Sequence, residues 1–577
     1  MPLRLENQEA RNWIVRKIGV IGPGIVGMPM AAMLANAEIR EGSPDPARIL
    51  VVQRESETSG WKVTSINSGV SPIKGIEPAL DEIVRKAVDR GLLSATHNSA
   101  ELWDADVVLV CVQTDKKDLE PDYGPLFSSL EALAQALQNK PSENIPLIVV
   151  ESTLAPSTLG TLIRDHFASY GLLDGRDVLL GFSPNRVMPG RLVERVRSSD
   201  KLVSGLLPVT PRLIKSIYSR IVTEGTLHET NTLTAEIVKT TENAYRDVRI
   251  AFSTEISRYC DQLDIDFFQL REAVNQDLNQ VDRASKDPNA VPFGGLLVPT
   301  VGVGGHCLPK DGILLLWRRI EKGACPPDSL ITQARRINDA SPAWTLRLTE
   351  AVAGDLRNKR VTVLGAAYRF NSEDTRNSPS LVLAKQLLEK EAHVWIHDPY
   401  VNREDQNLRR LGLTGFFTND LAQATCEAEV LIACTGHIDY VRELQTIRQS
   451  SPKLFAVVDA CNLWSRSDFE EPLRYTGIGR GTRAPDKDLV EFVTQGFRIM
   501  EYGFARELKD AVQFLNDHHA RDSFNRVSYL RVQQLAGTCS TGCRLAEPIP
   551  TEPLKPLRGF LPTLVEYASP KTLSVQA

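Results

Sequence analysis

The sequence predicts an α/β fold with two doubly wound parallel sheets, a long central helix between them and a C-terminal extension. Three observations support this. A glycine-rich turn follows an apolar run near the N-terminus, strand-like apolar runs then alternate with helical patterns, and the same strand–turn–helix order returns after residue 357. Alternation of this kind is typical of parallel sheets covered by helices.

The first turn lies in "RKIGVIGPGIVGMPMAAMLA", where Gly22, Gly24 and Gly27 give G-x-G-x-x-G between a strand and a helix. The first glycine permits the tight turn, the second lets a pyrophosphate approach the backbone, and the third allows the helix to pack on the strand. The helix N-terminus faces the phosphate charge. This context predicts a Rossmann-like dinucleotide site that also includes Ile25 and Val26.

Further strands are predicted in "ARILVVQ", "ADVVLVCVQT", "NIPLIVVEST" and "DVLLGFSP". Ligands of doubly wound sheets bind at the carboxyl ends of the strands. Thr114, Thr153 and Asn185 fall at those ends and are expected to face the ligands.

Residues 232–263 contain no proline or glycine over 32 positions, which predicts a long helix that bridges domains or crosses a dimer interface. A second Rossmann-like domain then begins with "NKRVTVLGAAYRF" and reaches the end of its second strand at Asp398. Because "GAAYRF" replaces the glycine motif, this domain should not hold a dinucleotide in the same way. We expect an NAD-binding domain over 1–228, a helical domain with a cysteine loop over 229–345, a Rossmann-like domain over 346–482 and a partly helical, then proline-rich extension over 483–577.

Bulk properties narrow the class of protein. The 577 residues are 42% hydrophobic and 24% charged, the net charge is −5, and no basic block indicates nucleic acid. The N-terminus lacks a signal peptide's apolar core, and no apolar run is long enough for a membrane span, so a cytoplasmic location is expected. The nine cysteines are scattered and indicate free thiols. Cys539 and Cys543 have no second pair, and no metal site is expected.

The segment "GVGGHCLPKDG" predicts a nucleophile. Cys307 lies two residues before Pro309, which is a favoured residue in the first turn of a helix. Unpaired N–H groups at a helix N-terminus stabilise a thiolate, and the glycines before the cysteine let a substrate approach. The alternative is a buried structural cysteine.

A dinucleotide and a thiol together suggest oxidation of an aldehyde through a thioester that water then cleaves. Such chemistry needs an oxyanion stabiliser and a proton acceptor. Lys239 and Asn243 lie four residues apart on one face of the long helix and suit these roles, although their spacing fits a solvated face equally well. Arg246, one turn further, could contact the substrate or only support the helix through Glu242. His437, in a loop after a strand, is expected to be structural.

Seven motifs, in order, carry a resemblance to a known family: "GPGIVGMP", "ESTLAPSTL", "GFSPNRVMPGR", "TAEIVKTTENAYRDVRIAF", "GVGGHCLPKD", "ARRINDASP" and "LGAAYRFNSEDTRNSP". Over residues 15–482 the chain resembles the UDP-glucose/GDP-mannose dehydrogenases. The blocks "ENAYRDVRIAF" and "GGHC" are most similar to the branch that oxidises UDP-N-acetylhexosamines of the ManNAc and GlcNAc types.

The resemblance implies four-electron oxidation of a sugar C6 hydroxyl to a carboxylate with two NAD, in a homodimer or higher oligomer that serves polysaccharide biosynthesis. It implies that Cys307 is the nucleophile, that Lys239 and Asn243 stabilise the oxyanion, and that Asp311 and Thr153 assist the attacking water. The remaining residues it implies fall into two sets. The substrate set is Asn185, Arg186, Lys239, Asn243, Arg246, Gly302, Gly304, Gly305 and Arg369, and the cofactor set is Gly22, Gly24, Ile25, Val26, Gly27, Gln53, Arg54, Thr114, Thr153 and Arg376.

Two positions depart from the family pattern. Asn185 stands where the family usually has glutamate, and an amide cannot accept a proton as a carboxylate does. Gln53 and Arg54 follow the second strand, where an acidic residue normally binds the adenosine ribose. Arg54 could meet a 2′-phosphate, so NADP remains an alternative to NAD.

Several functions remain open on the sequence alone. The substrate could be UDP-glucose or GDP-mannose rather than a UDP-N-acetylhexosamine. A β-hydroxyacid-type dehydrogenase would also combine a Rossmann domain with a lysine–asparagine pair, but it lacks a second Rossmann-like domain and transfers one hydride per substrate. A third possibility is a protein that binds sugar nucleotides without turnover.

Overall fold

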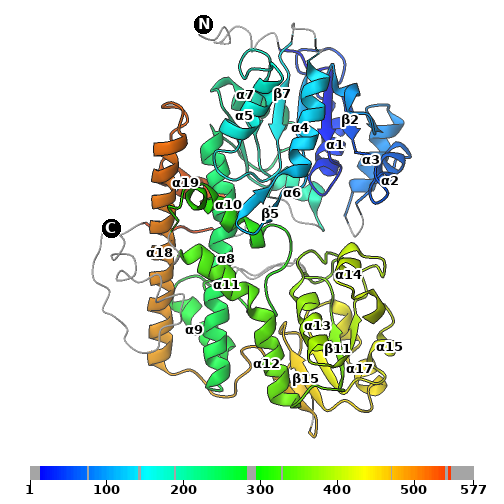
Figure 1. Cartoon of the computed structure of the whole chain (residues 1–577), viewed down its shortest axis with the longest axis vertical. Coiled ribbons are helices and arrows are strands. Elements are labelled where there is room, and N and C mark those ends of the chain that lie inside the picture. The colour runs from blue at the N-terminus through cyan, green and yellow to red at the C-terminus, as the bar shows by residue number, and fades with distance from the viewer. Residues whose placement is uncertain are drawn as a thin grey trace. The chain divides into compact units, whose positions relative to one another are not determined.

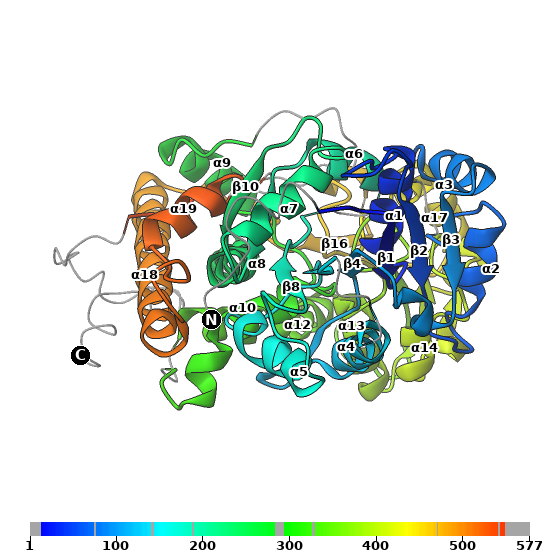
Figure 2. The same cartoon turned by 90° about the horizontal axis from the view of Figure 1, so that it is seen from above.

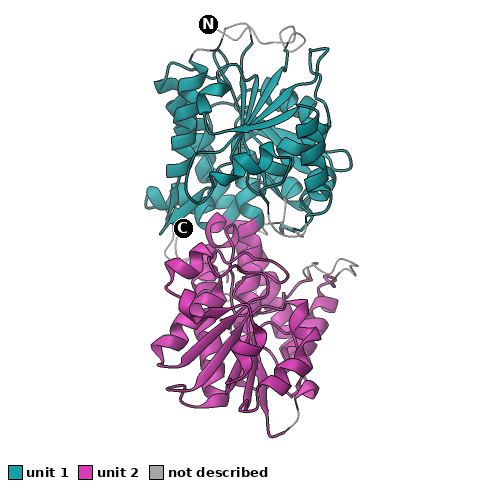
Figure 3. Cartoon of the chain, turned by 90° about the vertical axis from the view of Figure 1, so that its right-hand side faces the viewer, with its two compact units in different colours: residues 1–242, 313–325, 508–545 teal, residues 243–312, 326–507, 546–577 magenta. Residues whose placement is uncertain are grey.

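The computed structural model describes residues 13–73, 77–138, 140, 144–186, 190–282, 294–325, 329–469, 471–539 and 543–547. The chain divides into two compact units, coloured separately in Figure 3. Residues 1–242, 313–325 and 508–545 form the first unit, and residues 243–312, 326–507 and 546–577 form the second. Three helices contribute residues to both units: α8 (Thr232–Gln262), α10 (Leu308–Glu321) and α18 (Lys487–His519). The bounds of the four domains expected from the sequence stay predictions.

The first unit is built on an eight-stranded sheet with the order β10-β9-β8-β7-β4-β1-β2-β3. Its strands are β1 (Lys17–Ile21), β2 (Arg48–Val52), β3 (Leu93–Thr96), β4 (Val107–Val110), β7 (Leu147–Val150), β8 (Leu179–Phe182), β9 (Lys201–Gly205) and β10 (Leu227–Asn231). All pairings are parallel except that of β8 with β9. Figure 2 shows β1 between β4 and β2, and the strand order reverses at this point, where doubly wound sheets bind their ligands.

Helices bury the apolar surfaces of this sheet. On one face, α1 (Gly27–Asn36) packs with α3 (Leu80–Asp89) and α6 (Leu192–Ser198), and its buried side chains join those of β1 and β2 in one core. α7 (Val209–Tyr218) contacts β8, β9 and β10. α4 (Gly124–Leu137) contacts α5 (Arg164–Ser169) elsewhere in the unit. Strands buried on both faces explain why the sequence shows continuous apolar runs rather than alternation.

The second unit contains a six-stranded sheet with the order β13-β12-β11-β14-β15-β16, in which every pairing is parallel. The strands are β11 (Arg360–Leu364), β12 (His393–His397), β13 (Phe417–Thr418), β14 (Val430–Ala433), β15 (Ala456–Asp459) and β16 (Arg474–Gly477). α12 (Ser341–Ala353) packs against α13 (Pro379–Glu389) and against β15 and β16, while α15 (Leu421–Thr425) packs against α17 (Leu444–Ser450). Figure 1 shows these helices on both sides of the sheet.

The helical part of the second unit joins α8 to α9 (Phe267–Asp277), α11 (Leu330–Asp339) and α18. The rings of Phe252 and Phe497 meet edge to face at 5.7 Å, and the Tyr245 hydroxyl donates to Glu501 at 2.6 Å. Glu507 accepts from the backbone N–H of Leu330 at the start of α11. The first helix of the extension is therefore integrated into the core of this unit.

The two parallel sheets and the long helix confirm the α/β fold predicted from the sequence. The predicted strands correspond to β2, β4, β7, β8, β11, β12, β14 and β15, and the predicted long helix is α8. Most of the expected proline-rich segment lies outside the described residues. Within the described part of the chain, no helix is both long and apolar enough to cross a membrane, and no cluster of three metal-ligating side chains occurs.

Candidate active site and cofactor site

The turn after β1 has the geometry that a dinucleotide requires. Gly22 adopts φ +91°, a left-handed conformation suited to glycine, and its N–H donates to Val52 O at 3.0 Å. A Cβ on Gly27 would lie 2.1 Å from Gly22 O, whereas a Cβ on Gly24 would meet nothing within 4 Å. The backbone at Gly24 is therefore open to a pyrophosphate, and α1 begins directly behind it with Val26 at its N-cap.

Other predicted cofactor residues lie at the carboxyl ends of neighbouring strands of the first unit. The Gln53 amide donates to Arg54 O at 3.1 Å and to the Ser59 hydroxyl at 3.0 Å, so its two N–H groups are both used within the protein. The Thr114 hydroxyl donates to Thr153 O at 2.8 Å and joins the ends of β4 and β7. The residues present thus fit an adenine dinucleotide, which when bound would accept hydride from the substrate.

Cys307 is exposed and occupies the N-cap of α10. Its carbonyl oxygen accepts the first helical bonds, from the N–H of Lys310 at 3.2 Å and of Asp311 at 2.9 Å. The thiol therefore lies at the positive end of the helix dipole, where a thiolate is stabilised. A buried structural cysteine, the alternative weighed from the sequence, does not match this exposure.

A buried polar cluster lies one turn below Cys307 in the second unit. Asp311, which is fully buried, accepts from the Asn243 amide at 2.5 Å and from the Lys310 ammonium at 2.6 Å. These two donors use one carboxylate oxygen each, so the orientation of the Asn243 side chain is fixed. Asn243 is thereby positioned by Asp311, and the buried charge of Asp311 is paired with Lys310.

The glycine loop before Cys307 packs against the loop that follows β11. A Cβ on Gly304 would lie 2.3 Å from the Tyr368 Cβ, and a Cβ on Gly305 would meet the Tyr368 ring at 2.7 Å. The Gly305 N–H donates to Arg376 O at 2.8 Å, and the Asn377 amide donates to Gly305 O at 3.0 Å. The structure therefore brings the cysteine loop and the "YRFNSEDTRNSP" segment together.

Arg376 adds positive charge near the thiol. It pairs with Asp374 at 2.5 Å, and the hydrogen bond to Asp374 raises the pKa of Arg376, with a smaller contribution from Cys307. Burial raises the pKa of the Tyr368 hydroxyl to about 12, with contributions from Asp374 and Cys307, so the phenol is neutral at pH 7. A guanidinium therefore lies within electrostatic range of Cys307.

Asn185 contacts a buried network at the end of β7. Its amide donates to Glu151, which also accepts from the Lys201 ammonium at 2.7 Å and from the Tyr218 hydroxyl. Burial raises the pKa of Glu151, although its three donors oppose this effect. A glutamate in place of Asn185 would bring a second carboxylate to Glu151, so the amide found here is compatible with a charged Glu151.

The neighbouring Arg186 has a different environment from the one expected. Its side chain is 5% exposed and pairs with Glu242, which is 3% exposed. It also donates to the carbonyl oxygens of Asp200 and Leu535 and to the hydroxyl of Thr538. The expectation that Arg186 contacts the substrate stays a prediction, but these bonds favour a positioning role.

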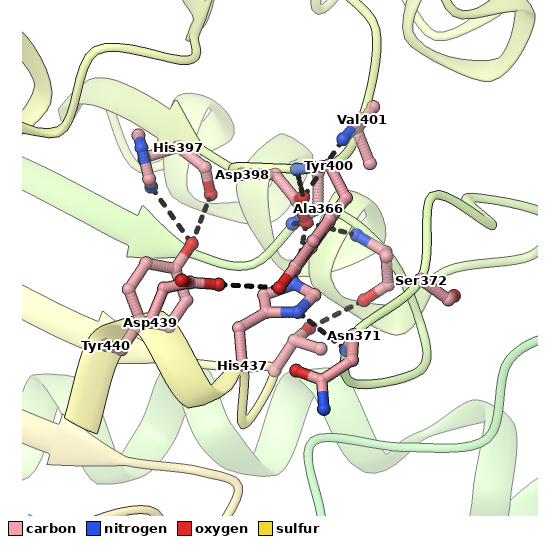
Figure 4. A network of polar contacts seen from close by, with 12 residues as sticks. Ala366, Asn371, Ser372, His397, Asp398, Tyr400, Val401, His437, Asp439 and Tyr440 are labelled. Carbon is pink, nitrogen blue, oxygen red and sulfur yellow. Dashed lines mark hydrogen bonds and ion pairs between the residues drawn. The ribbon is translucent and has the colours of Figure 1, made fainter. Parts of the chain in front are cut away.

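A second buried network organises the loop after β11, and Figure 4 shows it from close by. Asp398, at the end of β12, accepts from the backbone N–H groups of Ala366 at 2.8 Å and Ala367 at 3.0 Å, and from His437 Nε2 at 3.0 Å. His437 Nδ1 accepts from the Asn371 N–H at 2.9 Å, which assigns the hydrogen to Nε2. The loop that carries Arg369 and Arg376 is thus held by the buried carboxylate of Asp398 and the imidazole of His437.

Comparison with known families identifies the chain. Residues 16–222 match the NAD binding domain of the UDP-glucose/GDP-mannose dehydrogenase family, residues 233–340 match its central domain, and residues 362–466 match its UDP binding domain. The chain belongs to the UDP-glucose/GDP-mannose dehydrogenase family. It is an NAD-dependent nucleotide-sugar dehydrogenase. A β-hydroxyacid-type enzyme, which lacks a second Rossmann-like domain, does not fit this architecture.

Relatives match over nearly their full length. A UDP-N-acetyl-D-mannosamine dehydrogenase of Pyrococcus horikoshii is 30% identical over 472 residues, which cover 81% of this chain and 99% of the relative. An NDP-N-acetyl-D-galactosaminuronic acid dehydrogenase of Ralstonia solanacearum is 27% identical over 463 residues, covering 78% and 96%. The crystal structure of such an enzyme from Methanosarcina mazei superposes with a TM-score of 0.66 at 31% identity, covering 81% of this chain and 96% of that one.

The remaining predicted site residues lie in both units. Lys239 is buried on the portion of α8 that belongs to the first unit. Thr153 belongs to the same unit and is half-buried. Arg246 and Arg369 are half-buried in the second unit, and Gly302 packs against Pro379.

Sequence reasoning missed several side chains that hold the site: Lys310, Tyr368, Asn377, Glu151, Lys201 and Glu242. Lys310 lies beside Asp311 in "PKDG" and could have been found from that spacing. The partners of Glu151 are 34 to 67 residues away along the chain and left no local signal.

Proposed function

We propose that the chain oxidises the C6 hydroxyl of a UDP-N-acetylhexosamine to the uronate, with UDP-N-acetyl-D-mannosamine as the first candidate substrate. The main support is the exposed thiol of Cys307 at the N-cap of α10, with Asn243 and Asp311 fixed one turn below it. The named relative from Pyrococcus horikoshii, matched over 99% of its length, acts on this sugar nucleotide.

The residues of this chain would act as follows. Hydride leaves C6 to NAD, and the Cys307 thiolate adds to the aldehyde carbon. A second hydride departs to a second NAD, and the resulting thioester is cleaved by water. One hydroxyl, two NAD⁺ and one water give one carboxylate, two NADH and three protons. Asn243 donates a hydrogen bond to the oxyanion, Lys239 supplies positive charge, and Asp311 and Thr153 orient the water.

A second candidate substrate is a nucleotide-linked N-acetylgalactosamine derivative. The relatives from Ralstonia solanacearum and Methanosarcina mazei carry the name NDP-N-acetyl-D-galactosaminuronic acid dehydrogenase. Both candidates share the N-acetyl group and differ in the configuration of the sugar ring.

The test is incubation of the purified chain with NAD and a panel of nucleotide sugars, followed by mass spectrometry of the products. The panel contains UDP-N-acetylmannosamine, UDP-N-acetylglucosamine, UDP-N-acetylgalactosamine, UDP-glucose and GDP-mannose. We expect a uronate from UDP-N-acetylmannosamine and two NADH per sugar. Turnover of UDP-glucose or GDP-mannose alone would overturn the proposed substrate class, and one NADH per sugar would overturn the four-electron reaction.

The proposal extends to the setting of the enzyme. We expect it to act in the cytoplasm, as a homodimer or higher oligomer, and to supply a uronate for polysaccharide synthesis. Sedimentation of the purified protein would test the oligomeric state.

A further inference from the structure

The C-terminal extension reaches the loop that carries two predicted substrate residues. The matched family domains end at residue 466, so α18 and α19 (Tyr529–Gly537) lie beyond them. Within the first unit, the last turn of α19 supplies Leu535 O and the Thr538 hydroxyl to the Arg186 guanidinium, at 3.1 Å and 2.9 Å. Arg186 directly follows Asn185 in the chain.

The four terminal N–H groups of Arg186 are all committed to the protein. One nitrogen donates to Thr538 and to Asp200 O at 3.2 Å, and the other donates to Glu242 and Leu535 O. A guanidinium offers two hydrogens on each terminal nitrogen, so neither retains one for a substrate phosphate. Arg186 thus connects three buried segments of the first unit through hydrogen bonds.

The geometry at α19 favours this connection. Thr538 donates its hydroxyl hydrogen to Leu535 O at 2.7 Å, which leaves its oxygen lone pairs facing Arg186. Leu535 O belongs to the final turn of the helix, where it also accepts from the Thr538 N–H at 3.2 Å. The helix dipole is negative at this end, which stabilises a cation there.

The extension is held in place independently of Arg186. Asn231 accepts from the Thr234 N–H at the start of α8, and its amide donates to Phe524 O at 2.7 Å and to Arg526 O at 3.1 Å. Asn516 on α18 and Val527 exchange two hydrogen bonds of 2.8 Å each. The chain before α19 is therefore anchored at the N-terminus of α8, and α19 presents its last turn at a defined position.

From this arrangement we propose that α19 is a positioning element of the active site: its last turn fixes Arg186, and Arg186 fixes Asn185 and Glu242. Glu242 directly precedes Asn243 and lies three residues after Lys239 on α8, so a single guanidinium links the Asn185 loop to the helix that bears both predicted catalytic residues. The inference rests on the proposed function for its kinetic consequence, because it assigns Asn185, Lys239 and Asn243 to the substrate.

The test compares four single variants and one double variant of the full-length enzyme. Thr538→Val removes the acceptor at constant shape, and Thr538→Ser retains it. Ser528→Ala is the matched control, because it removes the N-cap of the same helix, where Ser528 accepts from the Arg531 N–H at 3.3 Å. Arg186→Lys keeps the charge but loses the forked geometry.

We expect Thr538→Val to raise KM for the nucleotide sugar about five-fold and to leave KM for NAD unchanged, because an unpaired buried N–H of a charged group is costly. Thr538→Ser should match the wild type, and Ser528→Ala should lower thermal stability without changing KM. Arg186→Lys should lower kcat/KM about 50-fold, and adding Thr538→Val to it should cost less than a further two-fold, because both remove the same contact.

Hydrogen exchange separates the outcomes. Thr538→Val should raise the amide exchange of residues 179–186, whereas Ser528→Ala should not. If the wild type forms no uronate from any sugar of the panel, the proposed function fails, and the exchange experiment still tests the connection. If Thr538→Val behaves like Ser528→Ala in KM and exchange, or if the effects of Arg186→Lys and Thr538→Val multiply, the role assigned to α19 is wrong.

Discussion

The first turns of the two sheets begin alike and then diverge. Gly22 after β1 and Gly365 after β11 both have a positive φ, of +91° and +100°. The N–H of each donates to the last residue of the second strand, Gly22 to Val52 O at 3.0 Å and Gly365 to His397 O at 2.8 Å. The backbone therefore adopts the same conformation after the first strand of each sheet.

The difference lies in the anion that the next N–H groups bind. In the second unit, Ala366 and Ala367 donate to the buried carboxylate of Asp398. In the first unit the corresponding position is Gln53, which is neutral, and the helix α1 begins five residues after Gly22. One turn binds an anion supplied by the protein, and the other has no carboxylate at the corresponding position.

This comparison teaches how one architecture serves two ligands. Because its turn is already occupied, the second sheet cannot hold a pyrophosphate at that place. The chain instead extends the turn to residue 378 before α13 begins, and the added loop carries Tyr368, Arg369 and Arg376. The loop packs on the glycines before Cys307, where Gly304 and Gly305 lie against Tyr368.

The largest expected effect is the loss of catalysis on substitution of Cys307, which lies outside both turns. Cys307→Ala should abolish uronate formation, because no other nucleophile is assigned to the aldehyde carbon, while NAD binding stays intact. Cys307→Ser should be severely impaired, since a hydroxyl is a much weaker nucleophile. Product mass and NAD titration are the measurements. An undiminished rate of uronate production by Cys307→Ala would refute the assignment.

The next effect concerns the NAD turn alone. In Gly27→Ala the new Cβ would lie 2.1 Å from Gly22 O, so the turn and the start of α1 must separate. A misplacement of this size should raise KM for NAD about 100-fold. Gly160→Ala is the control in the same unit, because its Cβ meets only an ordinary contact at 3.5 Å from Leu206. Equal KM values for the two variants would exclude a phosphate site at this turn.

A substitution at the turn of the second unit should change KM for the nucleotide sugar instead of KM for NAD. Asp398→Asn replaces one of the two acceptor oxygens by an NH2 group that cannot accept, so backbone N–H groups on that side of the carboxylate lose their partner. We expect KM for the nucleotide sugar to rise about 30-fold with KM for NAD unchanged, because the loop with Arg369 and Arg376 shifts. Asp439→Asn is the matched control, since Asp439 accepts only from the Tyr400 hydroxyl in this network. A rise in KM for NAD instead would contradict the division of roles.

The preference for NAD over NADP tests the difference between Gln53 and Asp398, which follow the second strands of the two sheets. Gln53→Asp would place a carboxylate where the second sheet has Asp398, and a negative charge repels a 2′-phosphate and accepts from ribose hydroxyls. The ratio of kcat/KM with NAD to that with NADP should rise about ten-fold. Arg54→Ala should lower any NADP activity and leave NAD activity nearly unchanged. If neither substitution changes kcat/KM with NADP, the adenosine ribose does not bind at Gln53 and Arg54.

The sequence predicted those features that depend on residues close together along the chain, and it did not predict those that depend on distant residues. The strands, Gly22–Gly27 and the position of Cys307 before Pro309 follow from local patterns of a few residues, and those patterns predicted the fold and the cysteine's place at the start of α10. The antiparallel pairing of β8 with β9 was not predicted, because nothing local specifies the direction of a neighbouring strand. α18 continues through Gly496 and Gly503, since packing against Tyr245 and Phe252 outweighs the cost of two glycines.

The supporting network was hidden for the same reason. From the sequence, Asp398 is predicted only to end a strand. Its hydrogen-bond partners Ala367 and His437 lie 31 and 39 residues away along the chain. The contact of Arg186 with Thr538 was not predicted either, because the two residues are 352 positions apart along the chain. Contacts of this length depend on the packed structure, and one sequence alone does not reveal them.

The smallest effect is a pH dependence that again distinguishes the two turns. Burial alone would raise the pKa of Asp398, but the hydrogen bond from His437 and those from the backbone lower it below its usual value. A carboxyl with a lowered pKa in the folded state stabilises the fold above the unfolded pKa of about 4, and this contribution is lost as the pH falls through the folded value.

The free energy of unfolding should therefore differ between wild type and Asp398→Asn by about 2 kcal/mol at pH 7, and the difference should shrink below about pH 4. Denaturant unfolding at pH 7, 5 and 3.5 measures it, with Asp439→Asn as the variant whose difference stays near zero. A difference that remains constant down to pH 3.5 would mean that the turn of the second sheet does not depend on an ionised carboxylate. The contrast with the turn left open for NAD would then rest on shape alone.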